Sequence, residues 1–193
     1  AWGSRARTGV AVLDAAGRLV FSSSVRSDDE IAALVQEYAP GDLVAAIDAP
    51  LVVPNETGRR PCEAMVGALF SRYYAGAYPA NRGNPAFNPQ PRGARLAQRL
   101  GWSMDPSVRP GVGRRVAIEV YPHPAMVVLF KLDTVIRYKA KRGRDLEMLR
   151  EAYALLLAHL ERVCGPLLGL AASPRWSELC DVVETATRLT GTK

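Results

Sequence analysis

The segment Asp42–Asp48 (DLVAAID) constrains the fold more than any other part of the sequence. It places five consecutive apolar residues between two acids, and Ala49-Pro50 breaks the extended pattern immediately afterwards. Continuous apolarity, rather than alternation of apolar and polar residues, is typical of a strand covered on both faces in a parallel sheet. We therefore expect a central strand of an α/β protein, ending at the carboxylate of Asp48.

A hairpin and a helix are predicted before this strand. Thr8–Asp14 and Arg18–Arg26 have the composition of two antiparallel strands, and Ala15-Ala16-Gly17 between them suits a tight turn. Ser27 and Glu30 form a capping box, which marks the start of a helix. The apolar residues that follow recur at helical spacing and predict one buried face: Ile31, Leu34, Val35 and Tyr38.

Two helices, a loop and a strand are predicted after it. Pro61 suits the first turn of a helix, whose apolar stripe is Cys62, Met65, Val66, Leu69, Phe70 and Tyr73. Residues 75–92 have no clear period and are rich in Gly, Pro and Asn, which predicts a long loop of the kind that often carries function. A short basic helix is expected over Gly93–Leu100, and a strand over Arg115–Tyr121, where apolar residues alternate.

The chain is expected to close with two helices. The first covers Asp145–Val163 and is ended by Gly165-Pro166, and the second covers Trp176–Leu189. A hairpin followed by strand and helix units predicts a mixed sheet with helices on its faces. The length of 193 residues fits one domain, which we expect to cover residues 1–193.

Cysteine spacing and apolar runs point to an intracellular protein. The three cysteines lie far apart and form no Cys-x-x-Cys pair, so neither a disulfide framework nor a zinc site is expected. No apolar run approaches the length of a membrane span, and no leader of the secretory type is recognisable. We expect a cytoplasmic location without a membrane partner. The sequence does not indicate the oligomeric state.

Charge is unevenly distributed along the chain. Residues 82–144 contain 13 basic and three acidic side chains, a net charge of +10, whereas the rest of the chain carries −4. A basic middle on an acidic frame is the pattern expected for a polyanionic partner, and we expect nucleic acid, DNA or RNA. The alternative is an arginine-rich surface that is merely solvated.

Two acids are the candidates for metal binding. Asp48 lies where ligands bind in open α/β sheets, at the carboxyl end of a strand, and Glu119 is a lone acid in an otherwise apolar strand. If the two carboxylates converge, they repel each other unless a divalent cation lies between them, and Mg²⁺ or Mn²⁺ is the natural match. The alternatives are that Asp48 only turns the chain and that Glu119 faces water from an edge strand.

Other polar residues are candidates for contact with substrate. His123 lies between two prolines four residues after Glu119, where it either contacts a phosphate and transfers protons near neutral pH or is fixed in a loop by backbone hydrogen bonds. Arginine suits bidentate phosphate contacts and lysine supplies a point charge. The candidates for phosphate binding are Arg59, Arg60, Arg82, Lys139 and Lys141.

The basic run that contains Lys139 and Lys141 also has a second interpretation, as an exposed turn before the helix at Asp145. Several aromatic residues lie near basic positions, so stacking on nucleic-acid bases is a further possibility: Tyr73, Tyr74, Tyr78 and Trp102. Among them, Tyr73 continues an apolar helical stripe and is expected in the core.

Five short motifs together resemble the DUF429 family of predicted RNase H-like nucleases. They occur in the family's order over nearly the whole chain: Ile47–Pro50, Arg59–Glu63, Tyr78–Arg82, Glu119–Pro124 and Tyr138–Lys141. The resemblance implies an α/β fold of the RNase H-like kind, a mixed five-stranded sheet with helices on both faces. It also implies hydrolysis of phosphodiester bonds by two metals. Asp48 and Glu119 match metal-ligand positions of the family.

The sequence departs from the family pattern at both ends. The resemblance implies a first strand with a further acid just before Ala1-Trp2-Gly3, and that strand is not in the sequence. It also implies a final helix bearing an Asp, and only Asp181 is available there as a substitute, on a helical face that suits solvent better. We therefore expect an RNase H-like domain that is incomplete at both ends and lacks its first strand.

The leading functional hypothesis is a metal-dependent nuclease in which Asp48 and Glu119 hold Mg²⁺ or Mn²⁺, with His123 as a further catalytic candidate. The first alternative is a non-catalytic nucleic-acid-binding or regulatory protein on the same fold, because two of the expected acids are absent. The second is a phosphotransferase of the same fold superfamily, since a fold does not fix a function. No glycine-rich phosphate loop supports that second alternative.

Overall fold

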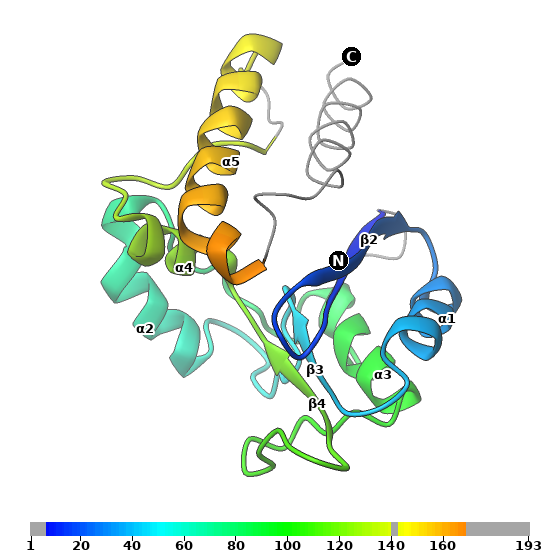
Figure 1. The fold of residues 1–193 in the computed structure, drawn as a ribbon. Helices are drawn as coiled ribbons and strands as arrows, with labels where there is room; N and C mark the ends of the chain where they lie inside the picture. Colours follow the sequence, from blue (N-terminus) through cyan, green and yellow to red (C-terminus); the bar gives the residue numbers. More distant parts are fainter. Residues whose placement is uncertain (1–6, 140–142, 169–193) are drawn as a thin grey trace.

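The computed structural model describes residues 7–139 and 143–168, which form a mixed α/β arrangement (Figure 1). In chain order the elements are β1 (Thr8–Leu13), β2 (Leu19–Val25), α1 (Asp28–Tyr38), β3 (Leu43–Ile47), α2 (Pro61–Phe70), the 3₁₀ turns η1 (Ser71–Tyr73) and η2 (Pro85–Phe87), α3 (Arg92–Arg99), β4 (Arg115–Glu119), α4 (Pro122–Phe130) and α5 (Leu146–Leu168). No helix among these residues is long and apolar enough to cross a membrane.

The predicted hairpin is confirmed. Strands β1 and β2 are antiparallel, with Thr8 opposite Val25, and Gly17 has a positive φ of 77° at the turn. The predicted cap of the next helix is also present, because the Ser27 side chain accepts a hydrogen bond from the Glu30 N–H. The Glu30 carboxylate accepts from the Arg26 N–H, one residue before Ser27, and so ties the end of the hairpin to α1.

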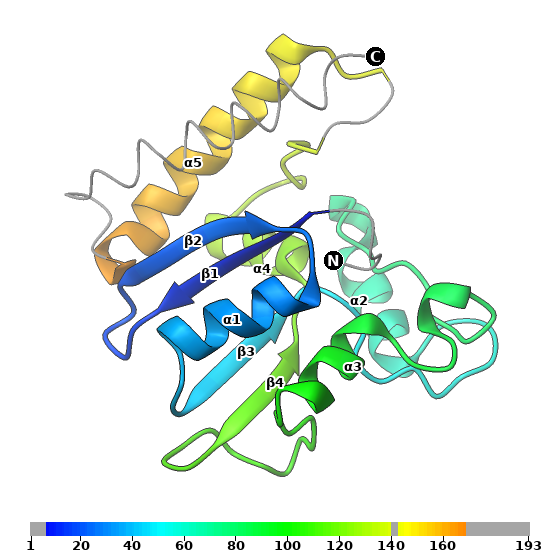
Figure 2. The same cartoon turned by 90° about the vertical axis from the view of Figure 1, so that its right-hand side faces the viewer.

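Strands β3 and β4 form a parallel pair that is the base of the candidate site. Leu43 lies opposite Arg115, and the register continues without a shift to Ile47 opposite Glu119. Parallel strands need a long crossover connection, and here it runs through α2 and α3. Figures 1 and 2 show α1 and α3 on one side of the strands, and α2, α4 and α5 on the other.

The hairpin and the parallel pair contribute to one hydrophobic core. Its buried members come from β2, α1, the segment after β3, α3 and its flank, and β4: Val25, Ile31, Val35, Leu51, Leu96, Ala97, Trp102 and Ala117. Val10 of β1 and alternate residues of β3, namely Leu43, Ala45 and Ile47, pack against it. The two pairs of strands therefore present apolar side chains to the same helical layer, α1 and α3.

The expected five-stranded sheet is not present among the described residues. The strands form two separate two-stranded sheets, β1-β2 and β3-β4. The expectation that β3 is covered on both faces is also wrong for these residues. Val44 is 49% exposed and Ala46 is exposed, because they alternate with the residues that enter the core.

The apolar stripe predicted for the second helix is only partly buried: Phe70 and Tyr73 pack against a small buried cluster, whereas three other residues of the stripe are exposed. Met65 and Leu69 are 67% and 59% exposed, and Cys62 is exposed as well. Helix α2 instead buries Glu63 and Gly67. The helical period was correct, but the first half of the helix turns inward the charged residue Glu63, which forms the ion pair described below.

Two predictions near the end of the described chain were wrong: one helix was missed, and another was ended too early. Helix α4 (Pro122–Phe130) was missed, because its two prolines read as a loop, although proline is favoured in the first turn of a helix. Gly165-Pro166 does not end α5, which continues to Leu168. Its apolar side packs on Met126, Phe130 and Ile136 as far as Val163. The helix predicted over Trp176–Leu189, with Asp181, lies outside the described residues.

Candidate functional site at the carboxyl ends of β3 and β4

The two candidate metal ligands lie at the same edge of the parallel pair. Glu119 is the last residue of β4 and lies opposite Ile47, and the Val120 N–H donates to the Ile47 carbonyl at 3.0 Å. Asp48 is the next residue after Ile47. Successive residues of a strand point to opposite faces, and the two carboxylates accordingly have different neighbours.

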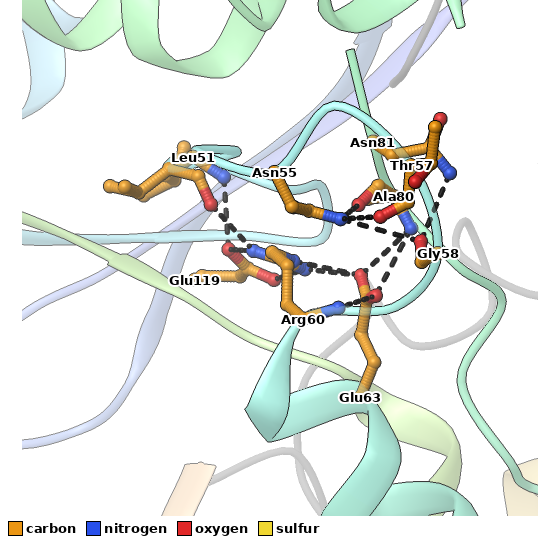
Figure 3. Close-up of polar contacts among 10 residues, drawn as sticks. Leu51, Asn55, Thr57, Gly58, Arg60, Glu63, Ala80, Asn81 and Glu119 are labelled. Atoms are coloured by element: carbon orange, nitrogen blue, oxygen red, sulfur yellow. Dashed lines mark hydrogen bonds and ion pairs between the residues drawn. The ribbon is translucent and has the colours of Figure 1, made fainter. Parts of the chain in front are cut away.

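Glu119 is held by an arginine. Its Oε2 accepts hydrogen bonds from Arg60 Nη1 at 2.8 Å and from the Leu51 N–H at 2.9 Å, and its Oε1 accepts from Arg60 Nη2 at 2.6 Å. This bidentate pairing is the strongest geometry available to a guanidinium and a carboxylate. Figure 3 shows Arg60 between Glu119 on one side and Glu63 on the other.

Glu63 completes what we call the Arg60 network, formed by Arg60, Glu63 and Glu119. Arg60 Nε donates to Glu63 Oε1 at 2.8 Å, and the Arg60 N–H donates to Glu63 Oε2 at 2.9 Å. The Ala80 N–H contacts both Glu63 oxygens at 3.1 Å, and Arg60 Nη1 also donates to the Val52 carbonyl. Every guanidinium nitrogen of Arg60 therefore has a partner inside the protein.

Arg60 and Glu63 are buried, so the stability of this network depends on their opposite charges. Arg60 is 6% exposed and Glu63 is 4% exposed. The hydrogen bonds that Arg60 donates to Glu119, and after them those to Glu63, raise the pKa of Arg60 above its usual value, against the opposing effect of burial. A buried charge is costly unless it is paired, so separating Arg60 from its carboxylates is unfavourable. The network therefore holds the start of α2, through Glu63, to the end of β4, through Glu119.

Two loops beside the network are joined by asparagines. Asn55 Nδ2 donates to the carbonyls of Thr57, Gly58 and Ala80, and Asn81 Nδ2 donates to the Gly58 carbonyl. The loop after β3 and the loop that contains Ala80 therefore form one unit (Figure 3). This unit carries two of the predicted phosphate-binding residues: Arg59 is exposed, and Arg82 pairs with Glu56 at 3.1 Å on the surface.

Asp48 lies in a different environment, beside an aromatic cluster. Burial, and after it the charge of Asp48, raises the pKa of both Tyr121 and Tyr138. The His123 ring packs near both tyrosines, with centroid distances of 5.4 Å to Tyr121 and 6.1 Å to Tyr138. Asp48 thus acts electrostatically on the same two tyrosines that His123 packs against, whereas Glu119 belongs to the Arg60 network.

One of the two predicted lysines lies beside this cluster. Lys139 is exposed, and its Nζ lies 5.8 Å from the centroid of the Tyr138 ring. Lys141 lies outside the described residues. Sequence reasoning missed the roles of Glu63, Tyr121 and Tyr138, although all three fall within the motifs Arg59–Glu63, Glu119–Pro124 and Tyr138–Lys141. The signal for Glu63 was its spacing of three residues from Arg60 at the start of a helix.

A divalent cation fits Asp48 better than Glu119. Within residues 7–139 and 143–168, no group of three or more His, Cys, Asp or Glu side chains could hold a metal ion. A cation at Glu119 would face the positive charge of Arg60 and compete with three hydrogen bonds. In the described part of the chain no cation is paired with Asp48. Mg²⁺ is commonly bound by one or two carboxylates together with substrate phosphates.

Comparison with known proteins gives one match. The family model described as "Protein of unknown function (DUF429)" matches residues 4–185, nearly the whole chain. No curated protein and no solved structure matches the chain.

Proposed function

The chain belongs to the DUF429 family, and on that premise we propose that it is a metal-dependent nuclease that hydrolyses phosphodiester bonds of nucleic acid. The observation that carries the proposal is the position of Asp48. It follows a strand whose carboxyl end meets that of its parallel neighbour, which is where open α/β sheets bind their ligands. Asp48 would hold Mg²⁺ or Mn²⁺ there together with phosphate oxygens of the substrate.

The fold is part of the same proposal. We place β1-β2 and β3-β4 in one RNase H-like sheet, in which a further strand lies between β1 and β3. Two observations support this arrangement. Among the described residues, β1 and β3 each have one unpaired edge, and both strands pack against the same core.

The residues around Asp48 suit the chemistry. A bound Mg²⁺ or Mn²⁺ supplies charge stabilisation for the attacking and leaving oxygens. His123 is placed in the same cluster and suits proton transfer to or from these oxygens near neutral pH. Lys139 is exposed beside the cluster and suits contact with a phosphate. Arg60 would act indirectly, by fixing the end of β4 through Glu119.

A non-catalytic nucleic-acid-binding protein is the second candidate. The observation that favours it is the engagement of Glu119 by Arg60, which leaves Asp48 as the acid best placed for a cation among the described residues. The phosphotransferase hypothesis has no comparable support in the described part of the chain.

A cleavage assay on the full-length protein tests the proposal. Labelled single-stranded, duplex, hybrid and branched substrates would be incubated with Mg²⁺ or Mn²⁺, and Asp48→Asn would be compared with the wild type. We expect cleavage that needs the metal and is lost in Asp48→Asn. Asp133→Asn, which removes an exposed acid from another loop, is the matched control and should cleave normally.

The alternative outcomes discriminate between the candidates. Cleavage that survives Asp48→Asn contradicts the proposed metal site. Binding of nucleic acid without cleavage of any substrate by the wild type overturns the nuclease and supports the binding protein.

A further inference from the structure

Three cation–aromatic pairs lie on two segments of the chain. The guanidinium carbon of Arg72 lies 4.6 Å from the centroid of the Tyr73 ring, and that of Arg137 lies 5.2 Å from the centroid of the Tyr74 ring. Lys139 Nζ lies over the Tyr138 ring. The three cations are exposed, so they hold the rings without being withdrawn from solvent. We refer to these six residues as the cation–aromatic surface.

The two segments are joined by buried contacts. The Val135 N–H donates to the Tyr73 carbonyl at 2.9 Å, and Ala75, Val127 and Val135 form a small buried cluster. Arg144 Nη1 donates to the carbonyls of Arg137 and Lys139, at 3.0 and 2.7 Å. The backbone beneath the surface is therefore fixed. The three cations and Tyr74 are open to solvent, whereas Tyr73 and Tyr138 are partly buried.

Tyr74 is held in an exposed position by its backbone. Its φ of 58° lies in the left-handed region, which is unfavourable for an aromatic residue. The Tyr74 N–H donates to the Ser71 carbonyl and the Ala75 N–H donates to the Phe70 carbonyl, and Ala75 is fully buried. These contacts fix the turn, yet the Tyr74 ring is 70% exposed. A small residue would fit this turn with less strain, so the ring itself needs an explanation.

An exposed ring, Tyr74, beside exposed cations matches the chemistry of single-stranded nucleic acid. The faces of its bases are free to stack on aromatic rings, and its phosphates attract basic side chains. In a duplex the base faces are hidden by stacking on one another. The sequence supports an anionic partner, since residues 134–144 contain five basic side chains and no acidic one.

We propose that the cation–aromatic surface binds single-stranded nucleic acid, with a base stacked on Tyr74 and phosphates at Arg72, Arg137 and Lys139. This inference rests on the proposed function and names its substrate class. Tyr138, beneath Lys139, belongs to the cluster beside Asp48. A strand bound along the surface therefore leads toward the Asp48 end of β3.

Binding is measured by the fluorescence anisotropy of labelled oligo(dT) and oligo(U), in EDTA so that hydrolysis plays no part. The test variant is Tyr74→Asn, because asparagine tolerates a positive φ while it removes the ring. We expect Kd to rise about tenfold, from the loss of one stacked base. Tyr74→Phe keeps the ring and should bind close to the wild-type affinity.

Arg137→Gln tests the phosphate contact. It should lower the slope of log Kd against log salt concentration by about 0.7, the value for one phosphate of a single strand. Arg109→Gln removes an exposed arginine from the loop before β4 and should leave that slope unchanged. Circular dichroism and thermal melting of each variant verify that it is folded.

Two results would overturn the inference. One is wild-type affinity in Tyr74→Asn, and the other is equal or tighter binding of a duplex by the wild-type protein. Because the assay needs no metal, single-strand binding that depends on Tyr74 without any cleavage would retain this surface and remove only the nuclease proposal.

Discussion

The Arg60 network and the cation–aromatic surface use the same kinds of charged groups in opposite ways. In the network, one buried arginine faces two carboxylates, and each of its guanidinium nitrogens has a protein partner. On the surface, Arg72, Arg137 and Lys139 are exposed and lie against neutral rings. The network includes Glu119 at the end of β4, and the surface includes Tyr138, whose pKa is raised in part by the charge of Asp48 just after β3.

The difference distinguishes charged residues that stabilise the fold from charged residues that are available to bind a partner. Charges that satisfy one another in the interior fix the chain and have little capacity left for a ligand. Charges that rest on aromatic rings at the surface keep their capacity to bind an anion. A charged residue identified from sequence alone, such as Arg60, therefore does not reveal its role until its partners are known.

The largest effect is expected from removing Arg60. Arg60→Leu leaves the buried Glu63 and the partly exposed Glu119 without their cation, so the free energy of unfolding should fall by about 3–5 kcal/mol, as measured by urea denaturation. Arg82→Gln is the control, because its pair with Glu56 is exposed and should contribute less than about 1 kcal/mol. Equal effects of the two substitutions would remove the distinction between network and surface.

Glu119→Gln sharpens the comparison at the end of β4. Glutamine keeps the shape but loses the charge that faces Arg60, and we expect a loss of about 1–3 kcal/mol in the free energy of unfolding. The loss should be the same with EDTA and with Mg²⁺. If Mg²⁺ stabilises the wild type but not Glu119→Gln, then Glu119 is a metal ligand, as the sequence first suggested, and the network opens to admit the cation.

How far the sequence predicted the molecule depended on how local the determining interactions were. The hairpin and the cap at Ser27 rest on turn and capping chemistry within a few residues, and both were correct. A strand ending at Asp48 was also predicted correctly from its continuous apolar run, but its burial on both faces was not. The burial of Glu63 in α2 was not predicted, since Glu63 pairs with Arg60, whose other partner, Glu119, lies 59 positions away in the sequence.

The candidate site shows the same limit. Sequence reasoning selected Asp48, Glu119, Arg60 and His123 as residue types suited to the chemistry, and all four lie near the carboxyl ends of β3 and β4. It could not divide them between two environments, because that division follows from side-chain contacts across the fold. Glu63 belongs to the motif Arg59–Glu63, but from the sequence it was not recognised as the partner of Arg60.

The stability of Tyr74→Asn tests whether the cation–aromatic surface contributes to the fold, which would remove its contrast with the Arg60 network. The substitution relieves backbone strain and removes one exposed cation–aromatic contact, so the free energy of unfolding should change by less than about 0.5 kcal/mol. Lys131→Asn is the matched control, because Lys131 also has a positive φ, 56°, and is exposed, with no aromatic ring at that position. A large loss of stability in Tyr74→Asn alone would assign the ring to the fold.

The smallest effect is expected at the tyrosines beside Asp48. Burial and then the Asp48 charge raise the pKa of Tyr121 and Tyr138 above the usual 10.0, so Asp48→Asn should lower both values while leaving them raised by burial. Ultraviolet titration of tyrosinate, compared with Asp133→Asn, measures the change. Because the folded-state pKa is the higher one, these tyrosines stabilise the fold below pH 10 and lose that contribution as the pH rises through their folded values. Unchanged tyrosine titration in Asp48→Asn would mean that Asp48 points away from the cluster, and the proposed path from the cation–aromatic surface to Asp48 would fail with it.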